Sequence, residues 1–166
     1  MKLRYAVLAS AIAIAVPQDK AWANNNITKR LLAEIEQKQE QAFMQETAQQ
    51  AFDRWVGAVE RGDAAAAAAL YADDAVLLPS SSPELLTTGK ARRAYLEKFI
   101  AGKRPAVTIS ESHVRVYDDM AVISGIYRFT YPGKKKKRPI PARFSLVYKQ
   151  HDGEWKIVDH HSSKLP

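Results

Sequence analysis

The spacing of apolar positions changes from a helical to a strand pattern about half-way along the chain. Residues 27–61 are almost free of helix breakers, and from Ala48 onward apolar side chains recur at i, i+3, i+4 and i+7, which is typical of a helix. Gly62 is suited to end this helix, and Asp63 is suited to cap a second, alanine-rich helix over residues 64–71.

Beyond residue 71 the apolar positions mostly alternate with a period of two, except in one further helical segment. The expected elements are a short strand, a third helix and four long strands, over residues 75–78, 90–101, 107–117, 121–131, 143–149 and 155–161. Asp152-Gly153 provides a tight hairpin turn between the last two strands. Helices that precede an antiparallel meander indicate an α+β fold, in which a curved antiparallel sheet wraps around the N-terminal helices and forms a cone with one open end.

Polar residues follow apolar ones on one face of the last strand. Strict alternation places Trp155, Asp159 and His161 on one face and His160 on the other. An apolar face that continues into Asp159 and His161 predicts a core that opens into a polar pocket. His160 would then point the other way and lie at a subunit contact.

The central strands carry apolar side chains on both faces. Within residues 121–131, Ile123 and Tyr127 share one face, whereas Val122 and Ile126 share the other. An antiparallel sheet usually leaves one face polar, so the second apolar face indicates another packing partner. No further element of the chain is left to supply it, and we therefore expect a homodimer or a higher oligomer.

The N-terminal segment has the pattern of a cleavable signal peptide. Lys2 and Arg4 precede a short apolar stretch over residues 5–16, and the small-x-small sequence of residues 21–23 suits a signal peptidase. The stretch is shorter than the roughly 20 residues that span a bilayer, which disfavours a permanent membrane anchor. We expect export across the inner membrane, with the periplasm as the destination.

Three segments follow from this pattern. Residues 1–23 form the signal peptide, residues 24–46 an N-terminal helical extension, and residues 47–166 a single folded domain. Within the extension, residues 34–45 have few apolar positions and indicate a separate or frayed helix.

Composition excludes several classes of function. The formal charge is +7, and most of it comes from the basic run Lys134–Arg138 rather than from a basic face, which argues against dedicated nucleic-acid binding. A solvated hairpin tip explains this run better than contact with anionic lipid does. Cysteine is absent, so disulfides and thiol chemistry are excluded.

The order of the elements and several motifs resemble the nuclear transport factor 2-like superfamily. Within it, the chain is most similar to exported bacterial relatives of the calcium/calmodulin-dependent protein kinase II association domain, from about Thr47 to the end. The motifs that carry the resemblance are Trp55, Gly62-Asp63, LYADDAVLLPS at residues 70–80, Gly89, Tyr95 and DGEWKIVDHHSS at residues 152–163.

This resemblance implies a non-catalytic module that associates with itself and binds small carboxylates through pocket arginines. Arg128 matches one pocket arginine of the kinase domain, and His161 matches a histidine near the end of its last strand. Leu146 replaces a second arginine, and a third falls near Arg93 and Ala94, so the anionic pocket is only partly reproduced. The chain has no kinase segment, so kinase activity is not expected.

Arg128, Asp159 and His161 are the expected polar residues of the pocket, together with Tyr127. Tyr95 and Trp155 are expected to line its apolar part. A buried arginine suits a carboxylate ligand, although an internal pair with Asp159 would satisfy it equally well. The expected ligand is a small carboxylate or an apolar small molecule.

An enzyme is the alternative reading of the same site. Asp159 could orient His161 as a general base in a small isomerase, dehydratase or cyclase, but the two side chains could also simply tie the sheet to a helix. His160 and His161 cannot share a metal because neighbouring strand residues face opposite sides. We expect no metal and no cofactor.

Overall fold

The computed structural model describes residues 26–100, 103–132 and 141–166. The signal peptide expected over residues 1–23 and the basic run at residues 134–138 lie outside these ranges. The described part of the chain contains three helices and five strands, an α+β architecture as expected from the sequence.

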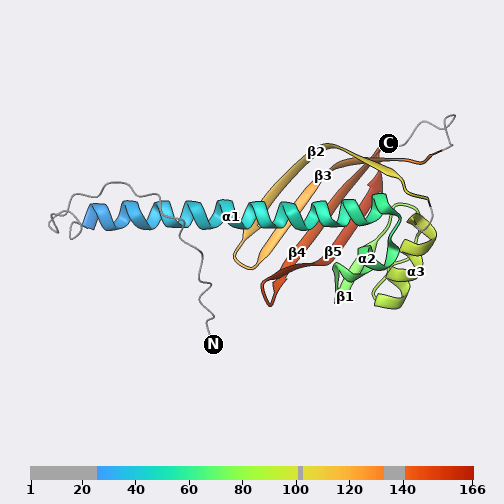
Figure 1. Ribbon diagram of the computed structural model, residues 1–166, viewed down its shortest axis with the longest axis horizontal. Coiled ribbons are helices and arrows are strands. Elements are labelled where there is room, and N and C mark those ends of the chain that lie inside the picture. Colours follow the sequence, from blue (N-terminus) through green and yellow to red (C-terminus); the bar gives the residue numbers. More distant parts are fainter. Residues whose placement is uncertain (1–25, 101–102, 133–140) are drawn as a thin grey trace. The chain divides into compact units, whose positions relative to one another are not determined.

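The helices precede or interrupt the strands in the predicted order (Figure 1). Their bounds are α1 Asn26–Arg61, α2 Ala64–Ala69, β1 Tyr71–Leu78, α3 Gly89–Ile100, β2 Ala106–Tyr117, β3 Met120–Thr130, β4 Ala142–His151 and β5 Glu154–Lys164. The first strand begins earlier than expected, because residues 71–74 already have extended backbone.

The helix α1 is continuous through residues 34–45, so the separate or frayed helix expected there is wrong. Gln, Glu, Lys and Ala are strong helix formers, and they extend a helix even where no apolar face is present. The described chain divides into two units, with the boundary between Lys38 and Gln39. The described helix segment of the first unit leaves its larger apolar side chains exposed, and these are Ile27, Leu31, Leu32 and Ile35.

The second unit contains one sheet with the strand order β1-β5-β4-β3-β2. The four strands β2 to β5 form an antiparallel meander, and β1 joins its edge parallel to β5. Figure 1 shows the C-terminal half of α1 against this sheet, with α2 and α3 beside β1. Phe52 of α1 stacks on Phe144 of β4, with ring centroids 5.2 Å apart.

Arg92 fastens α3 to an irregular part of β1. The pairing of β1 with β5 is interrupted between Tyr71 and Val76, so carbonyl groups of β1 lose their sheet partners there. The buried Arg92 guanidinium donates to three carbonyl oxygens of this segment, which belong to Ala72, Asp73 and Ala75. These hydrogen bonds satisfy carbonyls that the sheet leaves free.

A β-bulge in β5 reverses the faces of the last strand. Tyr148 of β4 pairs with Ile157, but its neighbour Val147 pairs with Asp159, so Val158 is an extra residue on β5. Before the bulge Trp155 and Ile157 are buried, whereas after it His160 and Ser162 are buried. The strict alternation assumed from the sequence therefore holds only as far as Ile157.

A second bulge bends β2 where it crosses Gly125 of β3. Ile109 pairs with Tyr127 and Glu111 pairs with Ile126, which leaves Ser110 as the extra residue. A Cβ atom on Gly125 would lie 2.0 Å from the carbonyl oxygen of Glu111. The curvature of the sheet therefore requires glycine at this position, because no side chain fits under the bulge.

We predict that Gly125→Ala lowers the free energy of unfolding by about 1–3 kcal/mol, since the methyl group forces the backbone of the bulge to move. Urea denaturation followed by circular dichroism measures this loss. Gly57→Ala is the matched control, because Gly57 lies inside α1 and its Cβ would meet only the flexible end of Arg61. The control should be neutral or stabilising by up to about 1 kcal/mol. Equal stability of the Gly125→Ala variant and the wild type would contradict this account of the bend.

Candidate functional site

A cavity of about 300 Å³ lies inside the second unit, between the sheet and the helices. It is lined by residues of α1, α3 and the strands β1, β3, β4 and β5, together with the segments that follow β1 and β3. This volume is at the lower end of the range found for small-molecule sites.

The walls of the cavity are mainly aromatic. Its aromatic lining consists of Trp55, Tyr71, Tyr95, Phe99, Tyr127, Phe129 and Tyr131. Several of these rings pack edge-to-face, including Phe99 against Phe129 with centroids 5.1 Å apart and Tyr127 against Phe129 with centroids 4.7 Å apart. Such packing holds the rings in fixed orientations and leaves flat surfaces toward the cavity.

Two buried polar side chains meet in the wall of the cavity. The hydroxyl of Tyr71 on β1 lies 2.7 Å from Nδ1 of His160 on β5, and both residues line the cavity. Burial lowers the pKa of His160 to about 3 and raises the pKa of Tyr71 well above its ordinary value. Both side chains are therefore neutral at neutral pH, and they are joined by one hydrogen bond.

Three buried polar atoms of the cavity wall make no hydrogen bond of normal geometry with the described residues, and they are Nε1 of Trp55, Nε2 of His160 and Oγ of Ser162. Trp55 and Ser162 still interact weakly with the hydroxyls of Tyr71 and Tyr127, which partly opposes the rise in the pKa of each phenol. The rings of Trp55 and His160 are in edge-to-face contact, with centroids 5.1 Å apart. Ser162 lies two residues after His160 and is buried on the same face of β5. Buried polar groups are normally paired, so this cluster suits a polar group of a bound molecule.

The structure brings two of the predicted site residues to the cavity. Tyr95 and Tyr127 both line it, as expected. Burial raises the pKa of both phenols, which are neutral like Tyr71. The Tyr95 hydroxyl lies 2.8 Å from the hydroxyl of Ser81.

Asp159 and His161 do not line the cavity, and this expected placement is wrong. The bulge at Val158 turns both side chains to the outer face of the sheet, where His161 is exposed and Asp159 is half-buried. Burial raises the pKa of the Asp159 carboxyl, and nearby His161 partly opposes this rise. His160, which was expected on the opposite face, takes the inward position.

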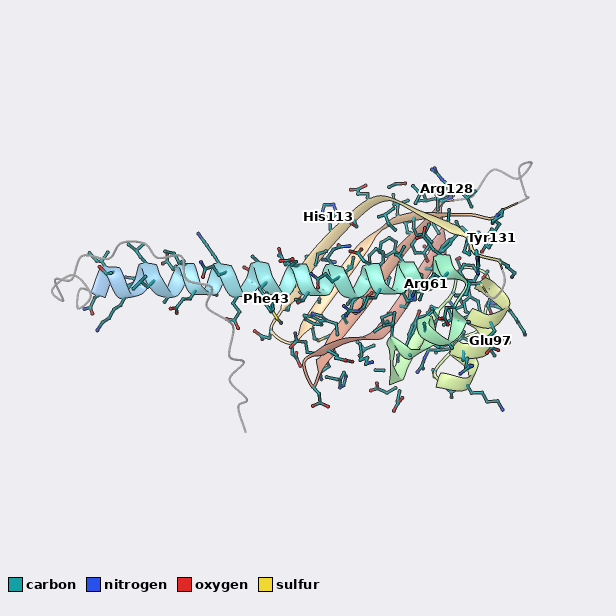
Figure 2. The ribbon with its side chains drawn as sticks, in the orientation of Figure 1. Phe43, Arg61, Glu97, His113, Arg128 and Tyr131 are labelled. Atoms are coloured by element: carbon teal, nitrogen blue, oxygen red, sulfur yellow. The ribbon has the colours of Figure 1, made fainter. Side chains whose placement is uncertain are left out.

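Arg128 and Trp155 also lie outside the cavity wall. Arg128 follows Tyr127 on β3 and points to the opposite face of the sheet; Figure 2 shows its side chain directed away from α2 and α3. Trp155 is buried, but its indole N–H donates to Oγ1 of Thr47 at 3.0 Å, which joins β5 to α1. Its role is therefore in the core of the domain.

Tyr71, His160 and Ser162 line the cavity although they were not expected there from the sequence. The sequence contains one indication of the bulge: Ile157 and Val158 are adjacent apolar residues in an otherwise alternating strand. Such a doublet is compatible with a bulge, and a bulge reverses the assignment of every later side chain.

The chemistry of the cavity favours binding over proton transfer. Of the described residues that line it, only Lys164 carries a charge, and that residue is exposed. A histidine whose pKa is lowered to about 3 is a weak base at neutral pH, and a tyrosine with a raised pKa is a weak acid. In the described ranges, no three His, Cys, Asp or Glu side chains converge as a metal site would require.

Comparison with known proteins identifies the family. Residues 44–166 match the calcium/calmodulin dependent protein kinase II association domain, and the chain belongs to this family. A search of curated proteins gave no match.

Three solved structures illustrate the similarity. A candidate calcium/calmodulin dependent protein kinase II association domain from Xanthomonas campestris is 40% identical, with a TM-score of 0.63 over 69% of this chain and 83% of the other. An NTF2-like protein of unknown function from Pseudomonas putida is 22% identical, with a TM-score of 0.67 over 74% and 87% of the two chains. A candidate dehydratase of the NTF2-like family from Streptomyces avermitilis is 18% identical, with a TM-score of 0.67 over 75% and 98%. The last two show the fold alone.

We predict that His160 makes folding pH-dependent. The neutral imidazole is buried in the folded state, whereas the unfolded chain takes up a proton below its ordinary pKa of about 6.5. Stability is therefore retained above pH 6.5 and is lost as the pH falls from 6.5 toward 3. Between pH 7.5 and 5.5 the loss from this one group is about 1.4 kcal/mol.

Urea denaturation at both pH values tests this. His160→Gln should lower the stability at pH 7.5 but remove about 1.4 kcal/mol of its pH dependence, whereas the matched His161→Gln variant should keep the wild-type pH dependence. The same pH dependence in His160→Gln as in the wild type would show that His160 is not held neutral.

Proposed function

We propose that this chain is an exported, non-catalytic module that binds a small molecule in its cone and associates with itself through the outer face of its sheet. The observation that carries the binding proposal is the aromatic cavity, in whose wall Nε2 of His160 has no partner and Trp55 and Ser162 make no hydrogen bond of normal geometry. A cavity lined in this way has both the apolar surface and the few convergent polar groups that characterise ligand sites.

The structure gives less support to an acid–base enzyme. Asp159 and His161, the pair considered for that role, lie on the outer face, and the inward pair of Tyr71 and His160 is held neutral. Proton transfer is fastest when the pKa of the catalytic group lies near the working pH, and neither of these groups meets that condition.

Self-association is supported by the family and by the outer face of the sheet. The family matched is an association domain, a name that itself refers to assembly. On the outer face, Val122 of β3 pairs with Val147 of β4, and Ile126 lies further along β3 opposite Arg143; the three apolar side chains are half-buried in a single copy. A second copy packed on this face would cover these apolar side chains.

Export is supported by the N-terminal sequence pattern. The basic start, the short apolar stretch and the small-x-small site at residues 21–23 suit a secretory signal peptide. We propose that cleavage after Ala23 releases residues 24–166 into the periplasm. Among the described residues, no helix has the length and apolarity needed to cross a bilayer.

Native mass spectrometry of the protein recovered from the periplasm of an expressing bacterium tests export and assembly together. We expect a subunit that begins at Asn24, assembled as a dimer or a larger oligomer. Val122→Lys should shift the population to monomer because it places a charge in the proposed interface. Leu85→Lys is the matched control, since Leu85 is an exposed apolar residue outside the sheet. A monomeric wild-type protein would overturn the assembly proposal.

A thermal-shift screen of small aromatic compounds tests binding in the cone. Compounds that bind the folded state should raise the melting temperature, and Ala142→Phe should abolish the effect by filling the cavity beside β4. Ala106→Phe, which enlarges an exposed residue of β2, is the matched control and should keep the response. Hits that persist in Ala142→Phe, or the absence of any hit, would contradict ligand binding in the cone.

A further inference from the structure

We propose that the cone takes a neutral, one- or two-ring aromatic molecule that carries a hydroxyl or carbonyl oxygen, and that it discriminates against carboxylates. This inference rests on the proposed binding function and specifies its ligand class. It departs from the carboxylate ligand that the sequence resemblance implies, because Arg128, the matched arginine, lies on the outer face of the sheet.

The size and walls of the cavity limit the shape of the ligand. The cavity has a volume of about 300 Å³ and a mainly aromatic wall, so it suits a small flat molecule better than a branched chain or a sugar. Tyr95 and Phe99 of α3 stack with centroids 5.7 Å apart, and Phe99 also meets Phe129 of β3 edge-to-face. A ligand ring can stack or pack edge-to-face against these surfaces without ordering new side chains.

The polar atoms of the wall favour an oxygen atom on the ligand. The indole N–H of Trp55 can only donate, so a ligand group that pairs with it must be an acceptor. Nε2 of His160 lies on the same wall without a partner, and Oγ of Ser162 has only a weak interaction with Tyr127. A hydroxyl can both donate and accept, and it can therefore satisfy any tautomer of His160. A carbonyl oxygen satisfies the tautomer in which Tyr71 donates to Nδ1 and Nε2 carries the proton.

The charges around the cavity disfavour an anionic ligand. An anion brought into this cavity would lose its hydration without gaining a ready cation, because burial disfavours a charged imidazole at His160 and Lys164 is exposed. The buried guanidinium of Arg92 lies 5.9 Å from the centre of the Tyr71 ring and already donates to three backbone carbonyls. Arg92 is therefore occupied in holding β1 to α3.

The experiment compares four probes that share one ring system, namely 2-naphthol, 2-acetylnaphthalene, naphthalene and 2-naphthoate. Isothermal titration calorimetry with the mature protein at pH 7 measures each affinity. We expect 2-naphthol and 2-acetylnaphthalene to bind at least about ten-fold more tightly than 2-naphthoate, because only 2-naphthoate must desolvate an ionised group on binding. Naphthalene, which has no oxygen, should bind about three- to ten-fold more weakly than 2-naphthol.

Two pairs of neighbouring residues supply matched variants. Ser162→Ala should weaken 2-naphthol binding about three- to ten-fold, whereas Ser163→Ala, on the outer face, should not change it. His160→Gln should weaken 2-naphthol binding by a similar factor, whereas His161→Gln should leave this binding unchanged. Trp55→Phe keeps an aromatic ring and removes the N–H, so it should reduce the difference in affinity between 2-naphthol and naphthalene.

The outcomes separate this inference from the proposed function. Tight binding of 2-naphthoate that is lost in Ala142→Phe would overturn the ligand class while leaving the binding cone intact. If Ser162→Ala and Ser163→Ala change the affinity for 2-naphthol equally, the proposed contact between the ligand and the polar atoms of Trp55, His160 and Ser162 is wrong. If none of the four probes binds, both the inference and the binding function are wrong.

Discussion

The bulge at Val158 is the constraint on which the interior of the cone depends. One extra residue in β5 turns His160 and Ser162 inward and Asp159 and His161 outward. The inward imidazole then meets the Tyr71 hydroxyl at 2.7 Å, and this hydrogen bond links β5 to the irregular edge strand β1. Without the bulge, a carboxylate would lie in the cavity, and the cone would be charged rather than neutral.

The rest of the domain supports that arrangement. The second bulge, over Gly125, curves β2 around the helices and gives the sheet its concave side. Arg92 holds β1 to α3 where the sheet pairing fails, so Tyr71 is fixed opposite His160. The concave side is consequently preorganised, and a ligand that fits it would need to order few side chains.

The sequence was sufficient to predict the fold and insufficient to predict the chemistry of the cone. Element order, the helical spacing from Ala48 and the strand alternation follow from local periodicity, and the family confirms the fold. Tyr95 and Tyr127 were placed correctly because their elements are regular. Asp159 and His161 were misplaced because a bulge depends on cross-strand packing, which periodicity along one strand does not encode. Arg92 was missed because its role is to satisfy backbone carbonyls distant in sequence.

The cavity contains a neutral imidazole, that of His160, whose free nitrogen is available to a ligand. Nitrogen-15 NMR of the folded protein, labelled in its histidine rings, tests the protonation of this imidazole. We expect that between pH 4.5 and 8 His160 keeps two distinct ring-nitrogen signals, one protonated and one not, and that 2-naphthol shifts the Nε2 signal. Convergence of the two signals of His160 as the pH falls through about 6.5, the ordinary histidine pKa, would show a protonated imidazole and contradict this expectation.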